Sequence, residues 1–345
     1  MPPAMPPAMP PAMPPRNLLL SFDAFGTLFR PARPIAAQYG DEARACGLAG
    51  LSDGALAASF GAALAAEAAA HPNFGRAAGL DPARWWERVV HATFAPLVPG
   101  GPAALPPALA PRLLRRFASG QAYVGAEGGR VPALLRALKA GRGAARPFAR
   151  VVVAVVTNSD DRVPGILQAL GFRVGPLRAG AAGSLQAVPV ARGPEAEAPP
   201  SLYDIDFHCM SYDVGFAKPD PRMFGAAEHV LAASSSLLLP GCDAAAGAGD
   251  GHLRDWVRVH VGDEYGKDVL GAVGARWDAI LLVADGEEAP DEMPMRSLDL
   301  VKTEAPGTVL TGGQAFTART IREVIEWLGG SVQAGREEGG QGEEG

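Results

Sequence analysis

The chain has 345 residues, of which 48% are hydrophobic. It can therefore build one large or two moderate cores without a metal or disulfide staple. Its 31 basic and 37 acidic residues give a net charge of −6, so it carries no positive excess to attract nucleic acid or an anionic membrane. Cys46, Cys209 and Cys242 lie too far apart for metal-ligand spacing or a secreted disulfide framework.

No apolar run approaches the roughly 18 to 20 residues that a membrane helix needs, and the N-terminus lacks a signal or presequence pattern. We therefore expect a cytoplasmic protein, with the nucleus also compatible. The expected partner is a small-molecule substrate, without nucleic acid or membrane, and the sequence identifies no protein partner.

Several segments have compositions that disfavour a packed structure. Residues 1–15 repeat Met-Pro-Pro-Ala, and this proline density predicts a disordered arm. Residues 331–345 are rich in Gly and Glu and predict a disordered tail. Stretches rich in Gly, Ala and Pro near 175–200 and 232–251 predict loop insertions.

The first predicted strand, residues 18–22, is apolar and ends at Asp23. The sequence then continues as Ala24-Phe25-Gly26-Thr27. Open parallel sheets bind ligands at the carboxyl ends of their strands. A carboxylate at that position can act as a nucleophile and form a covalent intermediate.

Residues 31–123 are dominated by Ala, Leu and Arg and show no clear strand, which predicts several packed helices. Because this segment follows the first strand, we expect a separate helical cap inserted into an α/β core of residues 16–30 and 124–330. Trp85 and Trp86 are expected to pack inside the cap.

The rest of the chain alternates strand and helix patterns. Residues 151–156, 256–261 and 279–284 are apolar runs typical of strands covered on both faces. A helical pattern follows at 163–170 and again near 269–273. Repeated strand–helix units predict a doubly wound, parallel, Rossmann-like sheet with right-handed crossovers.

Three further polar clusters follow in order. Thr157 and Asn158 end the second predicted strand, Lys218 lies in Phe-Ala-Lys-Pro-Asp-Pro, and Asp263 and Asp268 lie in Gly-Asp-Glu-Tyr-Gly-Lys-Asp. Each residue alone is usually a cap, a turn residue or a solvated charge. Four such clusters in one order are a much more specific signal.

This order resembles the haloacid dehalogenase-like hydrolase superfamily, whose motifs are an Asp, a Ser or Thr, a Lys and a Gly-Asp-x-x-x-x-Asp. The resemblance spans roughly residues 17–330. Residues 157–163 and 218–224 are most similar to the branch of haloacid dehalogenase-like hydrolase domain-containing protein 3. The resemblance implies a hydrolase with Asp23, Lys218 and Thr157 as catalytic residues and substrate contacts from Thr157, Asn158, Gly26 and Thr27.

The chemistry of phosphoryl transfer gives these residues physical roles. Lys218 supplies fixed positive charge, and Thr157 offers a hydroxyl and is expected to begin a helix whose N–H groups favour an anion. Asp23 with Asp263 can hold Mg²⁺, while Asp268 or Glu264 binds its waters from a second shell. The resemblance adds the backbone carbonyl of Phe25 as a further metal ligand.

Phe25 departs from the superfamily pattern, because related phosphatases usually carry there a second Asp that acts as general acid and base. Three interpretations follow. In the first, the protein is a Mg²⁺-dependent phosphohydrolase that is slow, selects good leaving groups or borrows an acid from the cap or Glu264. In the second, it is a 2-haloacid dehalogenase, because residues 23–29 closely resemble the first motif of those enzymes. In the third, it is a catalytically silent binding protein. The acidic pair Asp263 and Asp268 has no task in a metal-free dehalogenation, which favours the phosphohydrolase.

Overall fold

The computed structural model describes residues 16–141, 147–180, 185–187, 203–234, 253 and 255–330. The Pro-rich arm 1–15, the tail 331–345 and most of the two predicted loop insertions lie outside the described residues. Within this part of the chain, no helix has the length and apolar character required to cross a membrane.

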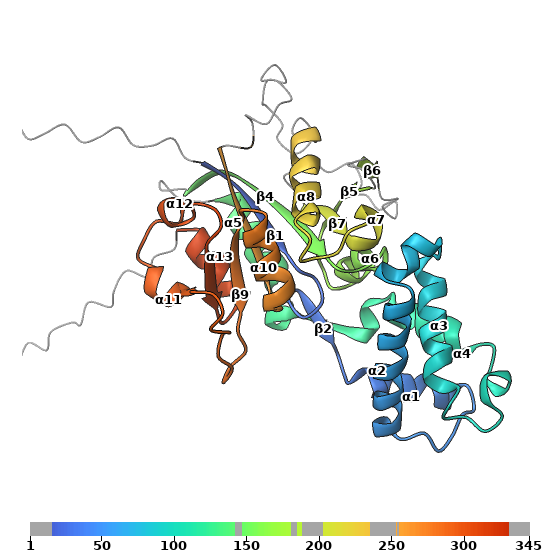
Figure 1. Cartoon of the computed structure of the whole chain (residues 1–345). Coiled ribbons are helices and arrows are strands. Elements are labelled where there is room, and N and C mark those ends of the chain that lie inside the picture. Colours follow the sequence, from blue (N-terminus) through green and yellow to red (C-terminus); the bar gives the residue numbers. More distant parts are fainter. Residues whose placement is uncertain are drawn as a thin grey trace, which may run out of the picture.

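A mixed, mostly parallel sheet forms the centre of the structure (Figure 1). Its order within the described residues is β10-β11-β9-β8-β1-β4-β7-β5-β6, and only β6 pairs antiparallel. The strands are β1 (Arg16–Phe22), β4 (Phe148–Thr157), β5 (Val174–Ala179), β6 (Leu185–Ala187), β7 (Ile205–Met210), β8 (Trp256–Gly262), β9 (Asp278–Leu282), β10 (Arg296–Ser297) and β11 (Ala315–Ala318).

Strand β1 occupies the middle of the sheet between β4 and β8, and Phe22 at its end pairs with Val155 and Val261. All three strands run parallel, so they deliver their carboxyl ends to one edge. The doubly wound parallel fold expected from the sequence is confirmed.

Helices cover both faces of the sheet. Because successive side chains of β1 point to opposite faces, its leucines pack against both layers of helices. Leu18 and Leu20 pack with α5 (Val131–Ala140), α6 (Arg162–Ala169) and α13 (Ile321–Leu328). Leu19 packs on the other face with α8 (Arg222–Ala233) and α10 (Leu270–Gly274). The shorter helices of the core are α7 (Ser211–Val214), the π-helix η8 (Tyr265–Val269), α11 (Leu298–Val301) and α12 (Pro306–Val309).

Between β1 and β4 the chain forms a helical insert, which lies beside the sheet in Figure 1. It comprises α1 (Ile35–Ala45), α2 (Asp53–Ala70), the short η1 (Asn73–Ala78), α3 (Pro82–Phe94) and α4 (Leu109–Phe117). Strands β2 (Phe29–Pro31) and β3 (Tyr123–Gly125) pair antiparallel where the insert leaves and rejoins the core. Helix α3 begins with the Asp81 carboxylate accepting from the Arg84 N–H and with Pro82 in the first turn.

The prediction of one loop insertion over 175–200 is wrong at its start, because β5 continues to Ala179 and β6 follows. Gly175 and Pro176 suggested a loop, but they lie where the register between β5 and β7 shifts. Pro is tolerated at such an irregularity. A Cβ on Gly175 would lie 2.3 Å from the Asp206 carbonyl oxygen, so the glycine allows close approach of β7.

Strand β7 has no counterpart among the predicted elements, because Asp206 and His208 interrupt its apolar pattern. Both are buried. The Asp206 carboxylate accepts a hydrogen bond from Lys139 at 2.6 Å and from the Val153 N–H at 2.8 Å. Paired polar groups can therefore occupy a buried strand that hydropathy alone does not reveal.

We expect Leu19→Ala to lower the free energy of unfolding by about 2 to 5 kcal/mol, because it leaves a cavity under the central strand. Leu19 is 0% exposed. Leu300→Ala is the matched control, since Leu300 is 77% exposed, and it should change stability by less than about 0.5 kcal/mol. Equal losses for both variants in urea unfolding would contradict this placement of the core.

Candidate active site

Asp23 lies directly after β1, at the edge of the sheet where the parallel strands end. Its N–H donates to the Val261 carbonyl of β8 at 2.9 Å, which fixes the backbone beside the neighbouring strand. The residue is 7% exposed. Within the described part of the chain, only Oδ1 of its carboxylate has a hydrogen-bond donor, so Oδ2 keeps its lone pairs available.

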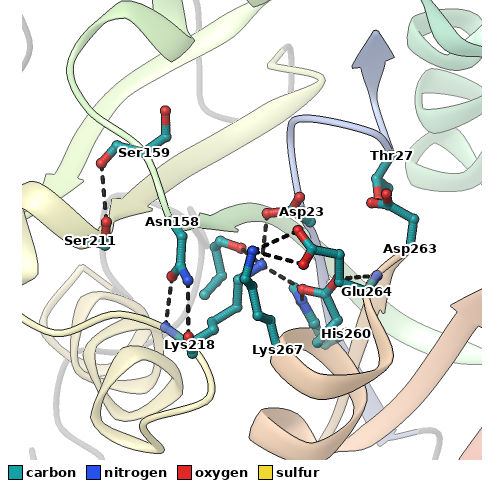
Figure 2. A network of polar contacts seen from close by, with 12 residues as sticks. Asp23, Thr27, Asn158, Ser159, Ser211, Lys218, His260, Asp263, Glu264 and Lys267 are labelled. Atoms are coloured by element: carbon teal, nitrogen blue, oxygen red, sulfur yellow. Dashed lines mark hydrogen bonds and ion pairs between the residues drawn. The ribbon is translucent and has the colours of Figure 1, made fainter. Parts of the chain in front are cut away.

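The buried ammonium group of Lys218 joins three parts of the chain (Figure 2). Its Nζ lies 2.7 Å from Asp23 Oδ1, 2.6 Å from Asp268 Oδ1 and 2.8 Å from the Val156 carbonyl oxygen. Burial by itself lowers the pKa of Lys218, but the Asp23 and Asp268 carboxylates outweigh it and raise that pKa. Lys218 therefore stays protonated and supplies a fixed positive charge.

Asn158 holds the backbone of Lys218 in place through two hydrogen bonds (Figure 2). The Lys218 N–H donates to Asn158 Oδ1 at 2.6 Å, and Asn158 Nδ2 donates to the Lys218 carbonyl at 2.9 Å. Thr157, at the end of β4, is 2% exposed and lines the same cavity as Asp23. The structure thus brings the second and third motifs to the first.

The prediction that Thr157 begins a helix is wrong, because α6 begins only at Arg162. Residues 158–161 form a loop between the strand and the helix. No helix therefore begins at Thr157 itself, and the cationic group at this edge is the Lys218 ammonium.

Asp268 is held on both of its oxygens. Oδ1 accepts from Lys218 and lies 3.1 Å from His260 Nε2, while Oδ2 accepts from the Glu264 N–H at 2.9 Å. Burial raises the pKa of Asp268, but hydrogen bonding to His260 and the charge of Lys218 outweigh it and lower that pKa. Asp268 is therefore an ionised carboxylate that holds the Lys218 ammonium and the Glu264 backbone in place.

His260 is a buried residue that the motifs did not identify. Its Nδ1 lies 2.8 Å from the hydroxyl of Ser21, two residues before Asp23. Burial first, and then the charge of Lys218, lower the pKa of His260. A neutral His260 fits this environment and can donate from Nε2 to Asp268. In the sequence, only the position of His260 two residues before Gly262, near the end of β8, indicated that it lies close to the site.

Asp263 completes a group of three carboxylates with Asp23 and Asp268, whose ligand oxygens all lie within 4.8 Å of one another. Asp263 is exposed, and its Oδ1 accepts from the Thr27 hydroxyl at 2.6 Å. Burial of the carboxyl group raises the pKa of Asp263, the Thr27 hydrogen bond opposes this, and Asp23 adds to the rise. Such a cluster of oxygen ligands suits a hard divalent cation.

Gly26 allows the Asp263 carboxylate to lie close to the backbone that follows β1. It has a φ of +92°, and a Cβ at this position would lie 2.1 Å from Asp263 Oδ2. Counted by formal charges, the three carboxylates and the Lys218 ammonium give the cluster a net charge of about −2. That charge is the complement of one divalent cation, so the residues present fit a metal.

Glu264 and Lys267 lie at the solvent side of the site and pair with each other at 2.7 Å. Both line the cavity described below. Phe25 is 45% exposed, and its ring packs edge-on against Phe29 and Tyr123 with ring centroids 5.9 and 6.1 Å apart. No carboxylate occupies this position, as the sequence indicated.

A cavity of about 500 Å³ connects the polar cluster with the interior of the helical insert. Asp23, Thr157, Asn158, Lys218 and Asp268 line one end, and apolar side chains of the insert line the rest. Trp85 packs in the insert as expected, and its Nε1 donates to the His71 carbonyl at 2.9 Å. The expectation of packing alone is incomplete, because Trp85 and Trp86 both reach the cavity.

Arg162 is a further cavity residue that the motif search missed. Its guanidinium binds both oxygens of Asp160, at 2.7 and 2.9 Å, and lies over the Trp86 ring at 4.5 Å. Trp86 Nε1 donates to Asp160 at 2.9 Å. The contacts of Trp86 with Arg162 and Asp160 could not be predicted from the sequence, because Trp86 is 74 residues from Asp160.

Sequence comparison with known proteins finds relatives from different organisms that carry the same name. The chain is 29% identical over 254 residues to haloacid dehalogenase-like hydrolase domain-containing protein 3 of Bos taurus, covering 74% of this chain and 77% of the relative. The protein of the same name from Homo sapiens is 28% identical over 276 residues, covering 79% and 84%. No family model matches the chain.

A solved structure of a defluorinating L-2-haloacid dehalogenase shares the fold. It aligns with a TM-score of 0.52 at 13% sequence identity and covers 90% of this chain and 95% of that chain. At this identity the likeness concerns the fold alone. The named relatives and the ordered motifs assign the chain to the haloacid dehalogenase-like hydrolase superfamily, and the solved structure shares its fold.

Proposed function

We propose that this hydrolase is a Mg²⁺-dependent phosphohydrolase that acts on a small phosphorylated molecule through an aspartyl phosphate on Asp23. The observation that carries the proposal is the group of three carboxylates with oxygens within 4.8 Å of one another. Lys218 lies between two of them, Asp23 and Asp268. The remaining negative charge requires a cation before an anionic substrate can approach.

In the first step, Asp23 Oδ2 attacks phosphorus while Oδ1 stays hydrogen-bonded to Lys218. The bond between phosphorus and the leaving oxygen breaks, and its electron pair departs with that oxygen. Water then attacks the aspartyl phosphate and returns Asp23 as a carboxylate, with inorganic phosphate as the second product. Two easier steps thus replace one difficult displacement.

Lys218 and the polar groups around it stabilise the charge that the phosphoryl oxygens carry. Lys218 is the buried cation, while Thr157 and Asn158 line the cavity beside it. Asp23, Asp263 and the Phe25 carbonyl would hold Mg²⁺, with Asp268 binding its waters. Mg²⁺ supplies charge neutralisation and orients the phosphate when it is bound.

A 2-haloacid dehalogenase is the second candidate, since halide leaves without a proton and Phe25 is no handicap there. Its substrate carries a carboxylate, and it would meet a cluster with a formal net charge of about −2. His260 cannot offset that charge, because burial and Lys218 lower its pKa. The acidic group therefore favours phosphate with a metal over a haloacid without one.

Asp23→Asn should abolish hydrolysis of every phosphate ester that the wild type cleaves, because an amide oxygen does not form the acyl phosphate. Its melting temperature should fall moderately, because the buried Lys218 ammonium loses one of its two carboxylate partners, while relief of the repulsion with Asp263 offsets part of that loss. Asp299→Asn, on the surface helix α11, is the matched control and should keep full activity. Retained activity in Asp23→Asn would exclude both enzymatic interpretations.

Gly26→Ala should weaken Mg²⁺ binding at least tenfold in titration calorimetry, because its Cβ displaces the Asp263 carboxylate. Gly47→Ala is the control: its φ of +86° is equally strained, but nothing lies within 4 Å of its Cβ. Both variants should lose about 1 to 2 kcal/mol of stability, and only the first should lose metal. A wild type that binds no Mg²⁺ would favour the dehalogenase or a silent protein.

Phe25→Asp should increase hydrolysis of an alkyl phosphate by up to about 10²-fold, because it restores a general acid beside the leaving oxygen. An ester with a good leaving group should gain much less. A dehalogenase would instead lose turnover, since the added anion repels the haloacid carboxylate. If the variant folds and neither it nor the wild type acts on either class, the protein is a binding protein.

A further inference from the structure

We propose that the substrate of this site is an aryl phosphate, a phosphate monoester whose leaving group is an uncharged aromatic system larger than one ring. The inference rests on the proposed function and adds the chemical class of the leaving group. It follows from two separate features, the lining of the cavity and the residue that replaces the general acid.

A chain of aromatic rings extends from the nucleophile into the helical insert. Phe25 contacts Tyr123 at 6.1 Å between ring centroids, Tyr123 contacts Phe117 at 6.1 Å, and Phe117 contacts Tyr39 at 5.5 Å. All four line the cavity that holds Asp23. Phe25 begins this wall two residues after Asp23, and both residues line the cavity.

A second aromatic group lines the same cavity. Phe74 packs edge-on against Trp85 at 5.2 Å, and Trp85 against Trp86 at 4.9 Å. The hydrogen bond from Trp86 to Asp160 fixes the orientation of its ring. Rigid aromatic faces and edges favour offset or edge-on contacts with an aromatic ligand.

The charges of the cavity disfavour a second anionic group on the substrate. Arg162 is paired with Asp160 through two hydrogen bonds, and Lys267 is paired with Glu264. Lys218 is already shared by Asp23 and Asp268. Among the described lining residues, every cationic side chain is thus matched by a carboxylate.

The size of the cavity indicates how large the leaving group is. A volume of about 500 Å³ lies within the range of sites that enclose a drug-sized ligand. The lining from the insert is mostly apolar, with further contributions from Ile35, Phe60, Leu64, Ala68, Val90 and Leu114. A sugar phosphate would leave its hydroxyl groups unpaired against these residues, at a cost in affinity.

The chemistry at Phe25 leads independently to the same class. Without a general acid, the leaving oxygen departs with its electron pair as an anion and takes a proton from water afterwards. An aryloxide carries that charge more easily than an alkoxide, because phenols are much stronger acids than alcohols. The missing carboxylate therefore costs least for an aryl ester.

The test compares 2-naphthyl phosphate with phenyl phosphate, whose leaving groups have nearly the same acidity but differ by one ring. With Mg²⁺ and wild-type protein, we expect a KM about tenfold lower for the naphthyl ester, because the second ring is buried in the cavity. Glycerol 1-phosphate should be hydrolysed at least about 10²-fold more slowly.

A pair of variants locates the effect in the insert. Leu64 is partly buried on α2 and lines the cavity, while Leu134 is partly buried on α5 and is not among the lining residues. Leu64→Asn should remove most of the naphthyl preference, whereas Leu134→Asn should keep it. Circular dichroism of both variants checks that they fold.

Binding to Asp23→Asn, measured by calorimetry with Mg²⁺, keeps the inference testable if turnover is too slow to measure. Naphthyl phosphate should bind about tenfold more tightly than phenyl phosphate. Equal binding of the two esters, or faster hydrolysis of glycerol 1-phosphate, would overturn the inference and leave the phosphohydrolase intact. Turnover that persists in Asp23→Asn would instead overturn the proposed function.

Discussion

The buried ammonium group of Lys218 is the interaction on which the rest of the site depends. It ties the end of β1 through Asp23, the end of β4 through the Val156 carbonyl, and the π-helix η8 through Asp268. Removing one partner from a buried ion pair typically costs about 3 to 5 kcal/mol, because the other charge is left uncompensated. The same contacts that hold the strand ends together therefore also orient the Asp23 carboxylate, so a change in one of these residues should affect both stability and the proposed chemistry.

Close backbone packing determines where the carboxylates lie. A Cβ on Gly262 would sit 2.2 Å from the Asp268 carboxyl group, and one on Gly26 would sit 2.1 Å from Asp263. Both acids thus reach the site only because a glycine faces them. Asp268 is further fixed by the Glu264 N–H and by His260. The negative charge of Asp268 is consequently held in place beside Asp23 and Asp263.

The sequence allowed the central strands and the four polar clusters to be predicted, because apolar runs followed by Asp23, Thr157 and Asp263 are local patterns. It did not allow β7 to be predicted, because the pairing of Asp206 with Lys139 is made in three dimensions. The aromatic lining of the cavity was hidden for the same reason. Phe25 and Tyr39 are distant in sequence from Phe117 and Tyr123, and only the folded insert links the four rings in one chain of contacts. Local patterns thus indicated the polar residues of the candidate site, while the lining of its cavity required the fold.

Phe25 belongs both to the motif that begins at Asp23 and to the aromatic lining of the cavity. In a site that keeps a carboxylate at this position, the protein lowers the barrier for a poor leaving group by donating a proton. In the proposed reaction, an aromatic ring gives up that contribution and adds apolar surface beside Asp23, contiguous with Phe29 and Tyr123. Binding energy from the non-reacting part of a substrate can offset part of the loss, provided that it orients the ester for attack by Asp23. The helical insert, rather than the polar cluster, would then determine which phosphate esters react at a useful rate.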